Sequence, residues 1–210
     1  MKHARIGDMM TVGAVPPRLA KALAVISAMM HQSFDFNPRI ETGWSRKSCV
    51  LASLTVRDFL NAIGCDNVRV RPVVTVMVAE RDGKRLHSLG IGTGEAGPRD
   101  KHWDGHLIVT ADAFVVDTTL FYARRDAWPL MPGMVALPIQ RDRRAPMFGL
   151  KPIAGLSLCD PDDKYEFSMV WLDNPANRGW EVGPDATHNI DLRTPVVAAM
   201  LGKFSAERAA

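Results

Sequence analysis

Cys49 is the residue whose type and position most directly suggest covalent chemistry. It follows Ser48, a residue type favoured as a helix N-cap, and precedes a run of apolar residues at helical spacing. The first turn of a helix has unpaired N–H groups and the positive end of the helix dipole, which favour a thiolate there. Arg46 and Lys47 add positive charge nearby. Cys49 is therefore a candidate nucleophile; the alternative is a small buried hydrophobe, the commoner fate of a free cysteine.

His106 and Asp117 flank a predicted β-hairpin. Short β-like runs at residues 107–109 and 114–116 surround a turn that we expect to centre on residues 111 and 112. His106 and Asp117 are equally far from that centre, so the pattern predicts that they lie directly opposite one another on one face. Opposed residues have Cβ atoms about 4.5–5.5 Å apart, within reach of an imidazole–carboxylate hydrogen bond. The alternative is an ordinary cross-strand pair on the protein surface.

A cysteine at a helix start and a histidine held by an aspartate are the components of a Cys–His–Asp triad. The imidazole would take or hold the thiol proton, and the carboxylate would fix its tautomer and favour the imidazolium. The Cys49 thiolate would attack an amide or thioester carbonyl, and His106 would protonate the leaving amine. We expect hydrolysis of an amide or peptide bond rather than transfer, because nothing in the sequence marks a site for a second substrate.

An acyl-transfer site also needs donors for the oxyanion of the tetrahedral intermediate. The backbone N–H of Cys49 can supply one, and at least one more is required. Trp44, Ser48 and Trp103 are candidate oxyanion or substrate contacts, and Ser45 is a further candidate donor. The sequence does not choose among them.

Two stretches of the chain resemble the transglutaminase-like, or papain-like, superfamily of cysteine enzymes. Residues 49–64 (CVLASLTVRDFLNAIG), followed by a valine-rich strand, are similar to its nucleophile helix. Gly105 and His106, together with residues 115–119 (VVDTT), are similar to its histidine and aspartate strands. The superfamily includes transglutaminases, peptide N-glycanases, arylamine N-acetyltransferases and bacterial papain-like peptidases. The resemblance covers roughly residues 43–120, just over a third of the chain.

The resemblance implies a role for each residue of the triad and a fold. Cys49 would be the nucleophile, His106 the base and Asp117 the residue that orients it. The fold would be α+β with a papain-like core, in which the nucleophile helix packs on an antiparallel β-sheet. Transglutaminases proper usually carry tryptophan after the cysteine and often proline after the aspartate, whereas this chain has Val50 and Thr118. We therefore expect the fold rather than transglutaminase activity itself.

Two alternatives keep the fold but change the function. The first is an acyltransferase similar to arylamine N-acetyltransferases, which would use a coenzyme A thioester. Basic residues could then contact its phosphates, although such clusters are usually solvated: Arg124, Arg125, Arg141, Arg143 and Arg144. The second is an inactive papain-like module with a binding or structural role. Under the leading hypothesis we expect no cofactor, and the substrate would be a peptide, an amide or a small acyl compound.

A third alternative is a metal-dependent hydrolase. His102 and His106 are four residues apart, the spacing of a helical zinc site, and Asp104 or His87 could complete a ligand set. However, Trp103 replaces the glutamate that such a motif needs, and the β-like run that follows argues against a helix. Glycines at positions 92, 94 and 97 match a dinucleotide-binding pattern, but Pro98 follows where a helix should begin. We therefore expect no metal, and read residues 90–97 as a loop.

The elements that must position these residues can be read from periodicity and from turn residues. We expect helices at residues 16–32, 48–64 and 194–208, and strands at residues 67–79, 107–109, 114–116 and 165–172. Asp82 and Gly83 indicate a turn, and residues 1–15 have no clear period and suggest an arm. This order predicts a single α+β domain over residues 1–210, with its core at about 17–120 and an irregular part at 121–210.

Composition limits the remaining classes. The 210 residues are 47% hydrophobic and 23% charged, which is typical of a folded globular protein. A net charge of +3 is too small for the basic surface of a nucleic-acid-binding protein. The N-terminus does not read as a signal peptide, and no apolar run is long enough to span a membrane. Three cysteines do not suggest a disulfide framework, so we expect a cytoplasmic protein.

Overall fold

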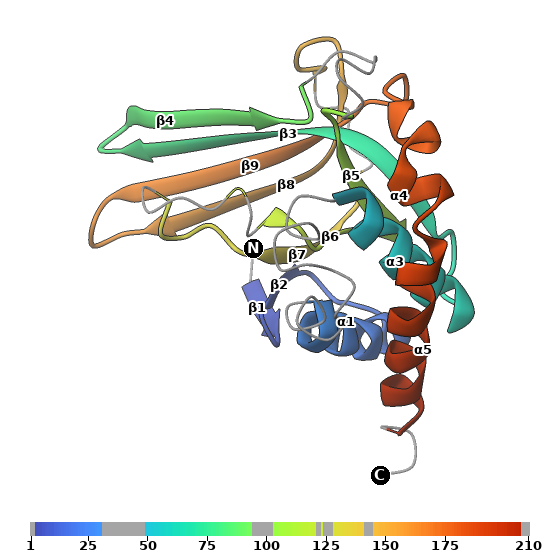
Figure 1. The fold of residues 1–210 in the computed structure, drawn as a ribbon. Helices are drawn as coiled ribbons and strands as arrows, with labels where there is room; N and C mark the ends of the chain where they lie inside the picture. Colours follow the sequence, from blue (N-terminus) through green and yellow to red (C-terminus); the bar gives the residue numbers. More distant parts are fainter. Residues whose placement is uncertain are drawn as a thin grey trace.

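A computed structural model describes residues 3–30, 49–93, 103–120, 123, 128–140 and 145–206 of this protein. The described chain folds as an α+β structure in which one curled sheet carries its helices at one end (Figure 1). The opposite end of the sheet extends away from the helices as a long ribbon (Figure 1). The predicted α+β class is therefore confirmed. No helix within the described ranges is both long enough and apolar enough to cross a membrane.

The sheet has nine strands among the described residues, and its pairing is antiparallel except between β2 and β7. Its order is β1-β2-β7-β6-β5-β3-β9-β8, with β4 also paired to β3. The strands are β1 (His3–Ile6), β2 (Met9–Val12), β3 (Arg69–Arg81), β4 (Lys84–Ile91), β5 (His106–Ala111), β6 (Phe114–Asp117), β7 (Met134–Pro138), β8 (Lys151–Asp160) and β9 (Tyr165–Asp173).

Strand β3 is long enough to pair with two strands in succession along one edge. Its residues 69–73 pair with β5, and residues 75–81 pair with β4, while β9 lies along the other edge. Ile91 at the end of β4 is opposite Thr75, and His106 at the start of β5 is opposite Val73. The end of β4 and the start of β5 are therefore neighbours, and His106 occupies this junction.

The helices are α1 (Pro17–Met30), α3 (Cys49–Ala62), α4 (Pro184–Thr187) and α5 (Ile190–Ala206), with a 3-10 turn η3 (Gly179–Val182). The apolar stripes of α1, α3 and α5 pack together against one face of β5 and β6. Phe59 of α3 meets Phe204 of α5 edge to face, with ring centroids 5.9 Å apart. Burial of each such side chain stabilises the fold by about 1.5–3 kcal/mol, so this contact helps to fix α3 against α5.

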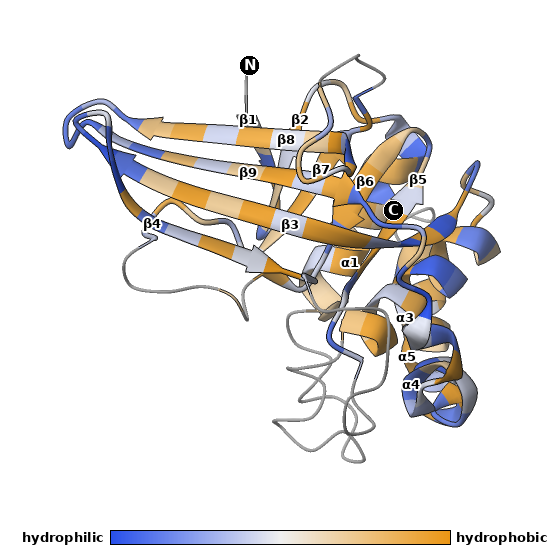
Figure 2. Cartoon of the chain, turned by 90° about the horizontal axis from the view of Figure 1, so that it is seen from above, coloured by the Kyte–Doolittle hydropathy of each residue, from blue (hydrophilic) through white to orange (hydrophobic). Residues whose placement is uncertain are grey.

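A second apolar cluster covers the other face of the same strands. It contains Ile108 and Val115 of the hairpin, together with Phe167, Met169 and Trp171 of β9. Strands β5 and β6 are consequently buried at every residue, whereas β4 is exposed along most of its length. Hydrophobic residues accordingly run along the inner strands, and hydrophilic residues gather at the ends of the ribbon (Figure 2).

Several sequence predictions are confirmed. The first two helices, the strand that became β3, the turn at Asp82–Gly83, the hairpin strands and β9 all lie where the pattern placed them. The C-terminal helix is predicted from residue 194 but begins at Ile190, so that Pro195 lies inside it. A threonine followed by proline is a common helix start, which explains the late prediction, whereas Thr194 here lies within the helix and donates its hydroxyl to the Ile190 carbonyl at 2.9 Å.

Three other predictions are wrong. Residues 1–15 are not a structureless arm, because β1 and β2 form a hairpin that joins the sheet through β7. Residues 121–210 are not mainly irregular, because they supply β7, β8, β9 and α5. The loop expected at residues 90–97 begins later, since Gly90 and Ile91 still belong to β4. Short edge strands and proline-flanked strands carry weak local signals, and pairing with neighbours stabilises them.

Candidate active site

Cys49 is the first residue of α3, and its side chain is half-buried. Its Sγ lies 3.7 Å from the carbonyl oxygen of Gly105, the residue that precedes β5. The thiol is also near enough to the His106 ring to contribute to the raised pKa of the imidazole. The start of α3 therefore meets the start of β5 across 56 positions of sequence.

The β5–β6 hairpin holds His106 and Asp117 in a register that differs from the predicted one. Its turn residues are Asp112 and Ala113, with φ of +49° and +65°, and Ala111 pairs with Phe114. His106 and Asp117 are therefore diagonal neighbours and not directly opposed. The turn centre moved by one whole residue, which preserves the alternation of faces, so the two side chains still share a face.

Diagonal neighbours are within reach of long side chains, and these two meet. His106 Nε2 lies 2.7 Å from Asp117 Oδ2, and the two side chains are 6% and 0% exposed. Because Nε2 is engaged with the carboxylate, Nδ1 is the ring nitrogen left to face Cys49. Asp117 thereby keeps a proton on Nε2 and holds the ring in one orientation.

The Asp117 carboxylate is fully supplied with donors. In addition to His106, Oδ2 accepts the indole N–H of Trp171 at 2.9 Å. Oδ1 accepts the backbone N–H and the hydroxyl of Thr119, at 3.2 and 3.3 Å. A buried carboxylate without partners would be very unfavourable, and these contacts allow it to remain charged.

The environment favours the charged forms of both His106 and Asp117. Burial opposes protonation of His106, but the charge and hydrogen bond of Asp117 outweigh it, and Cys49 adds to them, so the His106 pKa rises to about 10. Burial likewise opposes ionisation of Asp117, yet His106, Trp171 and Thr119 together lower its pKa below the ordinary value. At neutral pH the site therefore holds an imidazolium against a carboxylate.

Backbone contacts fix the strand that carries His106. Ser53 of α3 donates its hydroxyl to the Leu107 carbonyl at 2.7 Å, which joins the nucleophile helix to β5. Gly92 has φ of +77°, and a Cβ there would collide with the Val73 carbonyl and lie 2.9 Å from the His106 backbone nitrogen. Only glycine allows the chain leaving β4 to pass this close to His106.

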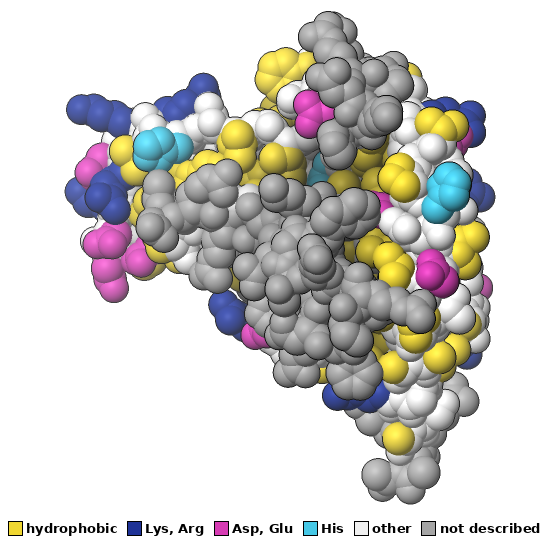
Figure 3. Space-filling view, viewed as in Figure 1, with side chains coloured by type: hydrophobic (Ala, Val, Ile, Leu, Met, Phe, Trp, Pro, Cys, Tyr) yellow, Lys and Arg dark blue, Asp and Glu magenta, His cyan; other side chains and the backbone are white. Residues whose placement is uncertain are grey.

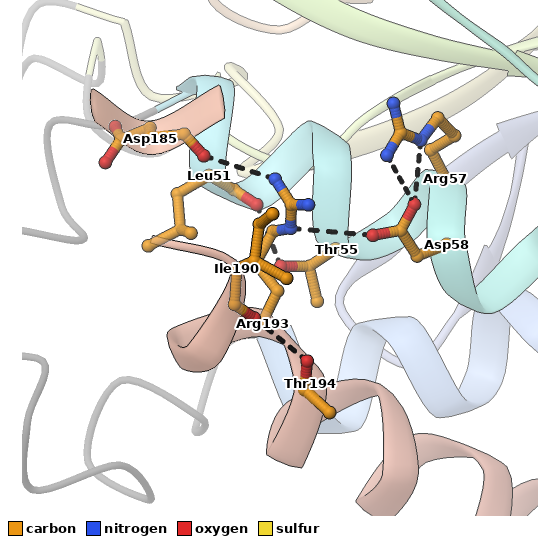
Figure 4. A network of polar contacts seen from close by, with 8 residues as sticks. All are labelled: Leu51, Thr55, Arg57, Asp58, Asp185, Ile190, Arg193 and Thr194. Atoms are coloured by element: carbon orange, nitrogen blue, oxygen red, sulfur yellow. Dashed lines mark hydrogen bonds and ion pairs between the residues drawn. The ribbon is translucent and has the colours of Figure 1, made fainter. Parts of the chain in front are cut away.

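An arginine on α5 anchors α3 from the side away from the sheet. Arg193 is 6% exposed, and its Nε lies 3.5 Å from Asp58 Oδ2 of α3. Figure 4 shows the same guanidinium reaching the backbone of Asp185 in α4, at 3.2 Å, while Arg57 contacts the other oxygen of Asp58. This network ties the helix that begins at Cys49 to the C-terminal helices.

Two tryptophans line the apolar surroundings of Cys49. Trp103 and Trp180 pack, partly buried, against a small cluster of Val50, Leu54 and Leu107. The Trp103 indole lies against Gly105 and Gly179, where a Cβ would collide with the ring, and its N–H is donated to Asn177 at 2.6 Å. Trp103 thus lies next to the candidate nucleophile, and its indole donor is engaged within the protein.

The remaining predicted contacts have different outcomes. Trp44, Ser45 and Ser48 lie outside the described residues, as does His102. Within the part of the chain that the structure describes, no group of three or more histidine, cysteine or acidic side chains could hold a metal ion. His87 is exposed on β4, opposite Ala79 of β3.

Two residues of the site were not singled out for it from the sequence. Trp171 is completely buried and donates to Asp117. Thr119 follows Asp117 by two positions, a spacing at which an aspartate commonly accepts the backbone N–H. That local pattern could have indicated Thr119, whereas no local pattern points from β9 to Asp117.

The other two cysteines lie in different environments. Burial, reinforced by Asp112, raises the pKa of the Cys65 thiol to about 12, so that it stays protonated at neutral pH. Cys159 is exposed on β8. Of the three cysteines, Cys49 is thus the one whose sulfur lies at the start of β5, beside the His106–Asp117 pair.

No family model, curated protein or solved structure matches this chain. Any functional assignment must therefore come from the geometry of the site.

Proposed function

We propose that the protein is a cysteine-dependent acyl-transfer enzyme, in which Cys49 is the nucleophile, His106 the general acid and base, and Asp117 the residue that orients His106. The observation that carries the proposal is the buried His106–Asp117 pair at 2.7 Å, with the Cys49 Sγ 3.7 Å from the carbonyl oxygen of Gly105, the residue next to His106. A thiol beside an imidazolium is the arrangement that activates a cysteine nucleophile.

The proposed reaction uses the two nitrogens of His106 differently. The Cys49 thiolate attacks an amide carbonyl, and the imidazolium gives its Nδ1 proton to the leaving amine as the carbon–nitrogen bond breaks. Water then loses a proton to the neutral ring and attacks the thioester, which releases the carboxylic acid and restores the Cys49 thiolate beside the imidazolium. Throughout, Nε2 stays bound to Asp117, which keeps the ring aimed at the sulfur.

The arrangement also supports our proposal that the fold has a papain-like, or transglutaminase-like, core. A nucleophile helix whose first residue meets a histidine at the start of an antiparallel strand, with an aspartate on the next strand, is similar to the transglutaminase-like core. Hydrolysis is favoured over transfer to a second substrate, and coenzyme A would enter only if the protein were an acetyltransferase. The expected substrate is a peptide, an amide or a small acyl compound.

The first test is selective alkylation with iodoacetamide, read by peptide mass spectrometry at each cysteine. At about pH 6 we expect Cys49 to react at least about tenfold faster than Cys159, because the imidazolium stabilises its thiolate. His106→Gln should remove this advantage, whereas Cys65→Ala, which leaves both compared cysteines in place, should leave it intact. Equal rates at Cys49 and Cys159 would contradict an activated nucleophile.

The second test detects the acyl-enzyme itself. Treatment with p-nitrophenyl acetate should leave an acetyl group on Cys49 and release a burst of nitrophenol, which Cys49→Ala should abolish. Cys65→Ala is the matched control, since that buried thiol is expected to stay protonated. A reactive Cys49 that never forms an acyl adduct would favour the inactive binding or structural module over an enzyme.

A further inference from the structure

Trp171 lies 54 positions after Asp117, on β9, yet it donates its indole N–H to the carboxylate that pairs with His106. We propose that Trp171 is a positioning residue, whose indole N–H holds the Asp117 carboxylate in the orientation in which Oδ2 faces His106. This inference rests on the proposed function, since it assigns Trp171 to the same site.

The distances explain why this donor matters more than the others. The contact from Trp171 is 2.9 Å, whereas the two contacts from Thr119 are 3.2 and 3.3 Å, near the long limit of good hydrogen bonds. Thr119 also binds only Oδ1. Trp171 is therefore the donor that shares Oδ2 with His106 and resists rotation of the carboxylate away from the ring.

Burial makes the contact both rigid and costly to lose. Trp171 is 0% exposed and Asp117 1% exposed, so an oxygen that loses the indole has no solvent immediately beside it to replace that donor. Trp171 is held by the pairing of β9 with β3, where it lies opposite Thr75. The sheet thus brings a donor from a distant strand to the residue that orients His106.

A second tryptophan provides a matched control for packing. Trp128 is 4% exposed, belongs to the same apolar cluster and contacts the Phe167 ring at a centroid distance of 6.0 Å. Within the described residues its indole nitrogen has no hydrogen-bond partner. Replacing either tryptophan with phenylalanine removes similar buried volume, but only Trp171→Phe removes a donor from Asp117.

The experiment compares the pH dependence of Cys49 alkylation in Trp171→Phe, Trp128→Phe and the unmodified protein. Without the indole donor the carboxylate is free to turn away from the ring, so the imidazolium is held less well. A less well held imidazolium stabilises a neighbouring thiolate less, so the Cys49 sulfur keeps its proton to a higher pH. We expect the acid limb of the rate in Trp171→Phe to move to higher pH by on the order of one pH unit, and that of Trp128→Phe to stay in place. Equal shifts in the two variants would overturn the proposal, because packing alone would explain them.

Thr119→Val gives a graded comparison at the other carboxylate oxygen. It removes the hydroxyl donor but keeps the backbone N–H and the side-chain shape. We expect a shift in the same direction as for Trp171→Phe but smaller, since the lost contact is longer. A larger shift than that of Trp171→Phe would overturn the assignment of Trp171 as the principal positioning donor.

A readout that requires no reactivity separates this inference from the proposed function. The Nε2 proton of His106, buried and bound to Asp117, should give a slowly exchanging resonance in ¹⁵N-labelled protein. We expect it to persist in Trp128→Phe and to broaden or disappear in Trp171→Phe. If it persists unchanged in Trp171→Phe, the positioning role is wrong. If Cys49 proves unreactive while the resonance behaves as expected, the proposed enzyme fails and the role of Trp171 stands.

Discussion

The β5–β6 hairpin holds an ion pair within itself, whereas the turn of the β3–β4 hairpin forms one with the β8–β9 turn, and the two pairs lie in opposite environments. In the β5–β6 hairpin, Asp117 and His106 are almost fully buried and 2.7 Å apart. At the β3–β4 turn, Asp82 lies 3.2 Å from Lys164, with side chains that are 59% and 73% exposed. Basic and acidic side chains gather at the end of the molecule away from the helices (Figure 3). The same kind of contact is thus placed once in the core and once in solvent.

The difference shows what burial demands of a charge pair. In water the attraction between two charges 4 Å apart is only about 1 kcal/mol, and the ordering of long side chains offsets much of it. In the core, the attraction is stronger, but every remaining lone pair needs a donor, and Asp117 has Trp171 and Thr119 for this purpose. The buried pair therefore depends on supporting hydrogen bonds that the exposed pair does not need.

The largest effect is expected from Asp117→Asn, compared with the identical change at Asp82. Asp117→Asn leaves His106 buried without its counter-charge, so we expect the free energy of unfolding to fall by about 3 kcal/mol or more. The Cys49 acylation rate should also fall by about 10²- to 10⁴-fold, because the ring loses its orientation. Urea unfolding and the p-nitrophenyl acetate burst measure the two effects. A loss no larger than that of Asp82→Asn would remove the distinction between the hairpins.

An intermediate effect is expected from pH. The pKa of His106 rises from 6.5 to about 10 on folding, so its contribution to stability is complete below about pH 6.5 and is lost as the pH rises toward 10. The pKa of Asp117 falls below 3.8, so its contribution is present above that pH and is lost in stronger acid. The stability advantage of the native protein over a His106→Gln/Asp117→Asn double variant should therefore be greater at pH 5 than at pH 9. Urea unfolding at the two pH values tests this, and an equal advantage at both would contradict the buried ion pair.

The smallest effect is expected at the exposed pair. Asp82→Asn and Lys164→Gln should each change the free energy of unfolding by less than about 0.5 kcal/mol, and added salt should reduce even that. Alkylation of Cys49 should be unaffected. A large loss from either substitution would show that the tip of the ribbon contributes more to the fold than its exposure suggests.

Much of the site follows from local sequence patterns, and the errors in the sequence predictions also have local causes. Apolar spacing correctly predicted the helix that begins at Cys49, because helical periodicity depends only on nearby residues. The alternation of the hairpin put His106 and Asp117 on one face, although the turn was placed one residue early. Ala113 adopts φ of +65° without being glycine, asparagine or aspartate, so the turn carried no strong signal.

The sequence by itself thus determined the helix that begins at Cys49 and the shared face of the His106–Asp117 pair, because both depend on periods of a few residues. The tertiary structure decided that the start of α3 meets the start of β5, and that Trp171 reaches Asp117 from β9. Those contacts span more than 50 positions each and exist only because β3 pairs with β5 along one edge and β9 along the other. Pairing between distant strands is set by burial of the whole sheet, which no short stretch of sequence encodes.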